Sequence, residues 1–500
     1  MHKNDHSENE ALKSILYRYQ APILEYLLYF LLFLFIYGSM ILRTGYHADE
    51  TLDFCGGGME TYIANGRWAL AAWKYILGYG PGTWTAGILV GLFATATVLC
   101  QLHLLEIKSL PARAIYAIAF MSLPQTAYTM TYSIQSDAVM FGVLATSLAA
   151  YCLTCQGWKK IFIATLLVTV SIGIYQSLAL NFAVTIVLVV LVGYIKQKTH
   201  LLSLICNGII VLISSLLIWF FLYKLVCKEN LLHISTELMQ EVQSGQASMI
   251  NHSGLTNLKS FAIYILHYGR IVVQTALCPH SYPGELVYTS AIIPVIILSY
   301  SVLRTKMTIP GKLFANAMLA FLWVSPFLMI LVMGTEWPCR PHTRIAEPIV
   351  FAALWGVVSN DVLKNRSFRL FILLLGVVTT IRGSLYVSHY AATERAKFEA
   401  RLHSFLRMED DAVKLALSNN IQPQKGNILY FRKMMKDKDG VRYSYADFCG
   451  QYPALRYLRY GNRAEEIEQH RNVLNSMPYY PQEGSIRVNN GVIIICGKQT

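Results

Sequence analysis

The stretch at residues 161–195, IFIATLLVTVSIGIYQSLALNFAVTIVLVVLVGYI, decides the fold because it holds 35 consecutive residues without a charge. A helix that crosses a bilayer needs about 17–25 residues, so this stretch is too long for one crossing. Lysine pairs flank it on both sides, at Lys159/Lys160 and Lys196/Lys198. Because short loops rich in Lys and Arg favour one side of a membrane, we predict two short helices joined at the polar tip 175–177.

The composition of the whole chain agrees with a membrane protein. Its 500 residues are 54% hydrophobic and only 14% charged, whereas soluble chains carry about 25% charged residues. Apolar runs predict an all-α polytopic protein with about eleven crossings, at 23–42, 84–105, 114–132, 137–155, 161–175, 179–195, 201–223, 287–303, 313–333, 346–360 and 370–388. The net charge of +13 falls mostly in short loops and in the C-terminal tail, so we expect no nucleic-acid partner.

The short basic connections predict the orientation. Five of them carry Lys or Arg: Lys108/Arg113, Lys159/Lys160, Lys196/Lys198, Arg304/Lys306/Lys312 and Lys364/Arg366/Arg369. If the helices alternate, all five face the cytoplasm, with the N-terminus inside and the C-terminus outside. Residues 258–278 are also apolar, but a central Arg270 would cost about 2.5–3.5 kcal/mol in a crossing. We predict an amphipathic or re-entrant helix there, on the outer side.

Two domains follow from this division. Residues 1–388 form the predicted membrane domain, and residues 389–500 form a small extracytoplasmic α/β domain. The tail shows a helical pattern over 394–417 and a strand-like end at 486–496. Cys449 and Cys496 both lie in the tail, where a disulfide is permitted, and whether they pair stays open.

The first outer loop, residues 43–83, contains the main candidates for chemistry. Asp49, Glu50 and Asp53 fall within five residues, directly after the first predicted crossing. A carboxylate at the membrane face, with its pKa raised by partial burial, is suited to act as a general base. The alternative is a solvated loop whose acids only help solubility. The acids are a weak metal signal, and His267, His280 and His342 are scattered, so we predict no metal site.

Three sequence features, which follow one another in order along the predicted crossings, resemble the bacterial glucosyltransferase-II family. They are the acidic pair Asp49-Glu50, the element NGRW at 65–68, and IYQS at 174–177. Its members are O-antigen-modifying, serotype-converting membrane glucosyltransferases, and the similarity covers roughly residues 20–390. The resemblance implies a GT-C-like glycosyltransferase that uses a polyprenyl-phosphate sugar and a first-loop carboxylate. Asp49 and Glu50 match the acidic pair, and both stay candidates for the catalytic residue.

The implied reaction is a direct displacement at the anomeric carbon of the donor. Because the leaving phosphate keeps a negative charge, cations should bind it, and the bidentate fork of Arg suits that task. The candidates are Arg340 and Arg344 in the loop EWPCRPHTR at 336–344, with Arg67 as a weaker one. The alternative for the Arg-rich loop is an anchor in the outer leaflet.

Sugar or acceptor hydroxyls have three candidate partners: Asp53, Asp137 and Gln176. Asp137 follows a polar tip at 125–136 and could instead cap its helix. Gln176 could instead join two helices by a hydrogen bond.

The expected protein is thus a multi-pass glycosyltransferase of the bacterial inner (cytoplasmic) membrane, with its active site and C-terminus periplasmic. It would move a hexose, with glucose expected, from polyprenyl phosphate to a hydroxyl of a surface polysaccharide or O-antigen. Its partners would be the lipid-linked donor, the polysaccharide acceptor and the bilayer. No cofactor is required, and a divalent metal is not supported. A polysaccharide polymerase and a non-enzymatic flippase of lipid-linked sugars are the alternatives.

Overall fold

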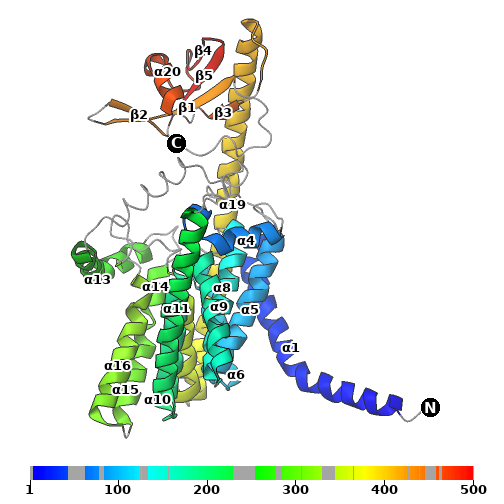
Figure 1. The fold of residues 1–500 in the computed structure, drawn as a ribbon, viewed down its shortest axis with the longest axis vertical. Helices are drawn as coiled ribbons and strands as arrows, with labels where there is room; N and C mark the ends of the chain where they lie inside the picture. Colours follow the sequence, from blue (N-terminus) through cyan, green and yellow to red (C-terminus); the bar gives the residue numbers. More distant parts are fainter. Residues whose placement is uncertain are drawn as a thin grey trace. The chain divides into compact units, whose positions relative to one another are not determined.

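The computed structural model describes residues 4–42, 62–77, 84–123, 125–126, 133–155, 157–228, 254–277, 284–305, 307–328, 331, 344–363, 365–424, 427–437, 440–444, 458–460 and 464–498. It is mostly helical, with a small sheet near the C-terminus (Figure 1). The chain divides into two compact units. The first contains the described residues up to Tyr390, and the second contains those from Ala391 onward.

The first unit is built from helices, many of which lie side by side in Figure 1. They are α1 (Asn4–Leu42), α4 (Trp68–Leu77), α5 (Trp84–Leu104), α6 (Leu110–Ser122), α8 (Ser133–Thr154), α9 (Trp158–Ile174), α10 (Leu178–Ile195), α11 (Leu201–Lys228), α13 (Gly254–Leu277), α14 (Gly284–Thr289), α15 (Ile292–Arg304), α16 (Ile309–Val324), the 3-10 turn η1 (Ser325–Phe327), α18 (Glu347–Val357), the π-helical turn η3 (Val358–Val362) and the first part of α19 (Arg366–Ser418). The close contacts of α8 with α5 and α9 form the centre of the unit.

Among the described residues, seven helices are long and apolar enough to cross a bilayer. They confirm the prediction of a polytopic, mostly helical membrane protein. The predicted count of about eleven is not confirmed, because four predicted crossings fall on shorter helices. These are α6, α9, α16 and α18, with 13, 17, 16 and 11 residues.

The stretch at 161–195 folds as predicted, into two helices with a sharp connection. α9 ends at Ile174 and α10 begins at Leu178. Small residues let the neighbouring helices approach closely. A Cβ added to Gly142 of α8 would lie only 2.4 Å from Leu178 Cδ1, so the start of α10 packs directly on the backbone of α8.

Basic connections meet at one end of the first unit, which we call the basic end. Lys196 and Lys198, after α10, both bind the carboxylate of Glu106, after α5. Lys196 Nζ also lies 3.7 Å from Asp361 Oδ2 in η3. The hydrogen bond from Lys198, supported by Lys196, lowers the pKa of Glu106 against the effect of burial. Because α10 has 18 residues, its first residue lies about 27 Å from the basic end.

Two helices bear on the predicted crossings after residue 250. α13 forms over the apolar stretch around Arg270 but is not among the candidate membrane spans. Its residues Tyr264, Tyr268 and Val272 are buried, whereas Arg270 is exposed, as an amphipathic helix requires.

α19 runs unbroken through 53 residues, although the sequence suggested a crossing and a separate helix. No Pro interrupts it, so nothing in its backbone ends the helix.

The second unit has a sheet between two helices. Its strands are β1 (Ile428–Asp437), β2 (Gly440–Ser444), β3 (Leu458–Tyr460), β4 (Ile486–Asn489) and β5 (Val492–Lys498), in the order β2-β1-β5-β4, with β3 paired to β1. One face packs on the end of α19, through Phe405 and Ala412. The other face packs on α20 (Ala464–Ser476), through Leu474, and includes the buried Cys496. Cys449 lies outside the described residues.

Candidate functional site

The turn at residues 62–67, before α4, forms the centre of a polar cluster. The cluster lies near the first residue of α10, at the opposite end of that helix from the basic end. The backbone carbonyls of three successive residues, 64–66, each accept a hydrogen bond from a different side chain. The donors are Tyr223 Oη at 3.2 Å, Gln176 Nε2 at 2.7 Å and Trp219 Nε1 at 2.9 Å. Gln176 comes from the connection between α9 and α10, and the two aromatic residues come from the end of α11. The turn is therefore fixed by two other parts of the chain.

Gly66 makes this arrangement possible. Its φ is +75°, in the left-handed region where side chains with a Cβ are disfavoured. A Cβ at this position would also lie 2.9 Å from Trp219 Cζ2 and 3.2 Å from Gln176 Nε2. Both the backbone angle and the packing therefore require glycine.

We expect Gly66→Ala to destabilise the protein by about 1–2 kcal/mol, from the left-handed backbone alone. The measurement is the apparent Tm of the detergent-solubilised protein. Gly38→Ala in α1 is the matched control, because no atom lies within 4 Å of its added Cβ and Ala favours a helix. A Tm of Gly66→Ala equal to or above that of Gly38→Ala would contradict this reading of the turn.

Arg67 follows directly and presents a cation with few partners. Its guanidinium Cζ lies 4.4 Å from the centroid of the Tyr175 ring, a favourable cation–π position. Its Nη1 donates to Gln135 Oε1 at the long distance of 3.5 Å. Its Nε is buried and has no hydrogen-bond partner among the described residues. Among the residues that the structure describes, no carboxylate forms an ion pair with Arg67. The group thus keeps both charge and hydrogen-bond donors for an anion.

Asp137, near the start of α8 (Ser133–Thr154), belongs to the same cluster. It is fully buried, and its Oδ2 accepts a hydrogen bond of 2.8 Å from Trp73 Nε1 on α4. The Trp73 ring stacks on Phe141, with centroids 4.7 Å apart. Gln135, two residues before Asp137, contacts Arg67. The start of α8 therefore contacts both Arg67, through Gln135, and Trp73, through Asp137. A buried carboxylate needs such donors, so this acid is held in a fixed position.

Arg344 lies in a separate, compensated environment before α18. It is 4% exposed, and its Nε lies 2.5 Å from Oε2 of Glu347 in the first turn of α18. Its guanidinium carbon lies 4.9 Å from the ring centroid of Phe327 and 5.9 Å from that of Tyr288. The nearby carboxylate neutralises much of the charge of this Arg.

The structure therefore brings together three of the predicted site residues: Arg67, Asp137 and Gln176. Four others lie outside the described residues: Asp49, Glu50, Asp53 and Arg340. In the sequence, the first three of these precede the turn at 62–67 by about ten residues. Among the residues that the structure describes, no group of three or more His, Cys, Asp or Glu is placed to hold a metal ion.

Sequence reasoning missed the residues that hold the cluster together. The indole N–H of Trp73 binds Asp137, and this contact spans 64 residues of sequence. Gln135 lies within the polar tip at 125–136, but its contact with Arg67 spans 68 residues of sequence. Trp219 and Tyr223 are four residues apart near the end of an apolar helix. That spacing places two hydrogen-bonding aromatic residues on one face, which is the signal that was available.

Comparison with known families identifies one family for most of the first unit. The family model described as glucosyl transferase GtrII matches residues 37–360, a range that includes the whole cluster. No curated protein matches the chain, and no solved structure does.

Proposed function

Because the chain belongs to the glucosyl transferase GtrII family, we propose that it transfers a hexose, and glucose in particular, from polyprenyl phosphate. The acceptor is a hydroxyl of a surface polysaccharide, such as an O-antigen, or of its lipid-linked precursor. The architecture would be of the GT-C type.

The proposal places the chain in the bacterial inner membrane with eleven crossings that alternate in direction. The shorter helices α6, α9, α16 and α18 then cross with the seven longer ones. The gathering of Lys196, Lys198 and other charged residues at the basic end supports a cytoplasmic position for that end. The cluster around Arg67 then faces the periplasm, as does the tail after residue 389.

Reporter fusions test this orientation. We expect cytoplasmic signals from fusions at residues 160, 200 and 366, because each follows or lies within a basic connection. A fusion at residue 480 should give a periplasmic signal. A cytoplasmic signal at 480 would break the topology and remove the tail from the active side.

The observation that carries the proposed chemistry is the guanidinium of Arg67. Its buried Nε–H has no hydrogen-bond partner among the described residues, and its charge has no carboxylate partner there. The phosphate that leaves the donor carries a negative charge, which an Arg fork can bind in two places. We therefore assign the donor phosphate to Arg67. Arg340 stays a second candidate for the phosphate. Arg344 is paired with Glu347 and would position the loop at 336–344, which contains Arg340 and Arg344.

In the proposed reaction a carboxylate of the first outer loop, Asp49 or Glu50, removes the proton of the acceptor hydroxyl. The oxygen attacks the anomeric carbon, the bond from that carbon to the phosphate oxygen breaks, and polyprenyl phosphate leaves. One carboxylate is sufficient for such an inverting transfer, because no covalent intermediate with the enzyme is formed. Asp53, Asp137 and Gln176 would orient sugar hydroxyls. Of these, Asp137 is fixed by Trp73.

The reaction as proposed requires no cofactor, since guanidinium groups and the lipid chain hold the donor. A divalent ion would have to bind the acidic loop at 49–53. Transfer in the presence of a chelator decides between these two cases.

Mass analysis of surface polysaccharide, from cells with and without the gene, tests the function. The proposal expects the loss of one side-branch hexose when the gene is absent. Loss of all long chains would instead identify a polymerase. Accumulation of lipid-linked sugar on the cytoplasmic side, with transfer intact in broken membranes, would identify a flippase.

A further inference from the structure

One face of α13 is apolar and exposed. Leu258, Leu266 and Val273 are 54%, 82% and 55% exposed. Ala262, four residues after Leu258, is exposed as well. Because a helix turns once every 3.6 residues, the spacings of four, four and seven residues place these side chains on one line, which we call the apolar stripe. An exposed apolar surface on a folded unit marks a contact with another protein or with a membrane.

The opposite face of α13 is fixed to the first unit. Asn257 Nδ2 donates to the carbonyl of Leu331 at 3.0 Å. The rings of Tyr264 and Tyr268 lie 5.5 Å and 5.3 Å from the ring of Phe327 in η1, and both tyrosines are buried. Since these contacts hold the tyrosine face inward, the apolar stripe faces away from the unit.

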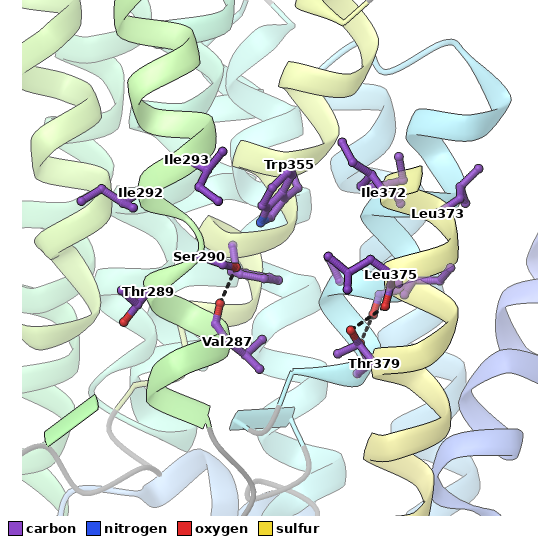
Figure 2. A pocket seen from close by; sticks show the side chains of 16 residues that line it. Val287, Thr289, Ser290, Ile292, Ile293, Trp355, Ile372, Leu373, Leu375 and Thr379 are labelled. Carbon is purple, nitrogen blue, oxygen red and sulfur yellow. Dashed lines mark hydrogen bonds between the residues drawn. The ribbon is translucent and has the colours of Figure 1, made fainter. Parts of the chain in front are cut away.

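α13 lies at the level where a membrane span begins. The Thr289 hydroxyl donates to the Tyr268 hydroxyl at 3.3 Å, and Thr289 is the third residue of the candidate span Val287–Arg304. Figure 2 shows Thr289 and Ile292 on this segment, where they border an apolar cavity. The Tyr268 ring also lies 6.0 Å from the ring of Trp323, and Tyr and Trp gather at the surface of a bilayer. Since α13 is not among the candidate spans of the described residues, it lies along this surface.

A basic edge runs beside the apolar stripe. Lys259 and Arg270 are exposed, and neither forms an ion pair among the described residues. They are eleven residues apart, about three turns, so they lie on one line. Lys259 follows Leu258, and Arg270 comes one turn after Leu266. Long basic side chains beside an apolar surface keep their charged ends at the level of the lipid headgroups.

We propose that α13 lies in the bilayer surface and binds anionic phospholipid. The apolar stripe contacts the acyl chains, and Lys259 and Arg270 contact the phosphate groups. α13 contains no Asp or Glu, so its net charge favours a negatively charged surface. A second copy of α13 on the same face would instead bring like charges together, which disfavours self-association there. This inference depends on the membrane fold and not on the transferred sugar.

Photo-crosslinking tests the proposal in the full-length protein. A benzophenone amino acid is placed at Leu266 in one preparation and at Ile296 in another. Ile296 of α15 is 60% exposed on a candidate membrane span, so it contacts bulk lipid and is the matched control. Each protein is reconstituted in bilayers of phosphatidylcholine and phosphatidylglycerol, and the crosslinked lipids are identified by mass. A single basic residue near an anionic surface favours anionic lipid about fivefold. Phosphatidylglycerol should therefore be enriched at least fivefold at Leu266 relative to Ile296.

Charge variants connect this enrichment to the two cations. Lys259→Gln combined with Arg270→Gln should lower the share of phosphatidylglycerol at Leu266 to that in the bulk bilayer. Lys259→Arg combined with Arg270→Lys keeps both charges and should preserve the enrichment. Lys224→Gln is the control, because Lys224 is also exposed but belongs to α11, and it should leave the enrichment unchanged. NaCl at 1 M should reduce the enrichment, since salt screens exposed charges.

Three results would overturn the proposal. The absence of lipid adducts at Leu266 would show that the stripe contacts water or protein, and a crosslink to a second copy would identify self-association. Equal shares of phosphatidylglycerol at Leu266 and Ile296, or enrichment that survives the loss of both charges, would remove Lys259 and Arg270 from headgroup binding. None of these measurements uses turnover, so they stand apart from the test of the proposed function.

Discussion

Replacement of Asp49 by Asn is expected to reduce hexose transfer by about 10²–10⁴-fold, the usual contribution of a general base. Asn keeps the shape of the side chain but cannot accept the proton of the acceptor hydroxyl. The donor should still bind, because the proposed function attributes its affinity to its lipid chain and to cations rather than to an acid. Transfer and donor binding are therefore measured in the same membrane preparation.

Glu50→Gln is the comparison that separates the two acids. We favour Asp49 as the base, since an Asp side chain has one rotatable bond fewer than a Glu side chain. Glu50 would then raise the pKa of Asp49 through repulsion between like charges, so its replacement should have the smaller effect. Full activity in both variants would remove this loop from the chemistry and move attention to Asp137.

The second large effect is expected at Arg67. A hydrogen bond to a charged group is worth about 1.5–3 kcal/mol, so Arg67→Gln should weaken donor binding by roughly 10- to 150-fold. Turnover should fall as well, because the phosphate gains charge as it leaves. Arg67→Lys should recover part of the loss, since it restores the charge without the fork.

Arg304→Gln is the matched control for Arg67→Gln. The guanidinium carbon of Arg304 also lies 4.4 Å from the centroid of a tyrosine ring, that of Tyr300. Arg304 is the last residue of α15 and begins one of the basic connections, so it does not belong to the cluster around Arg67. We expect wild-type donor affinity in this variant. Wild-type affinity and turnover in Arg67→Gln itself would show that the phosphate binds elsewhere, with Arg340 as the next candidate.

Local patterns predicted much of the fold. The uncharged run at 161–195 with its polar centre predicted the pair α9 and α10, because charge and length are local properties of a membrane helix. The amphipathic helix predicted around Arg270 forms as α13, which is not among the candidate membrane spans of the described residues. The continuous α19 was not foreseen, since a change from apolar to polar composition reads as a boundary even where the backbone has no reason to break.

The candidate site was harder to predict, because its contacts join distant parts of the chain. The sequence places NGRW and IYQS more than a hundred residues apart, and only the folded chain places Gln176 Nε2 at 2.7 Å from the carbonyl of Asn65. Similarly, no local signal indicates that Arg344 has a carboxylate partner whereas Arg67 has none among the described residues. Which charges are compensated depends on tertiary packing, and this decides which cation is available to a substrate.

Transfer by the purified full-length protein in lipid bilayers tests the central claim most directly. The protein is supplied with an acceptor polysaccharide and with glucose labelled either on polyprenyl phosphate or on a nucleotide. The account predicts that label moves to the acceptor from polyprenyl phosphate, with release of the lipid phosphate, and does not move from the nucleotide sugar. Transfer from the nucleotide sugar, or no transfer from either donor, would contradict it.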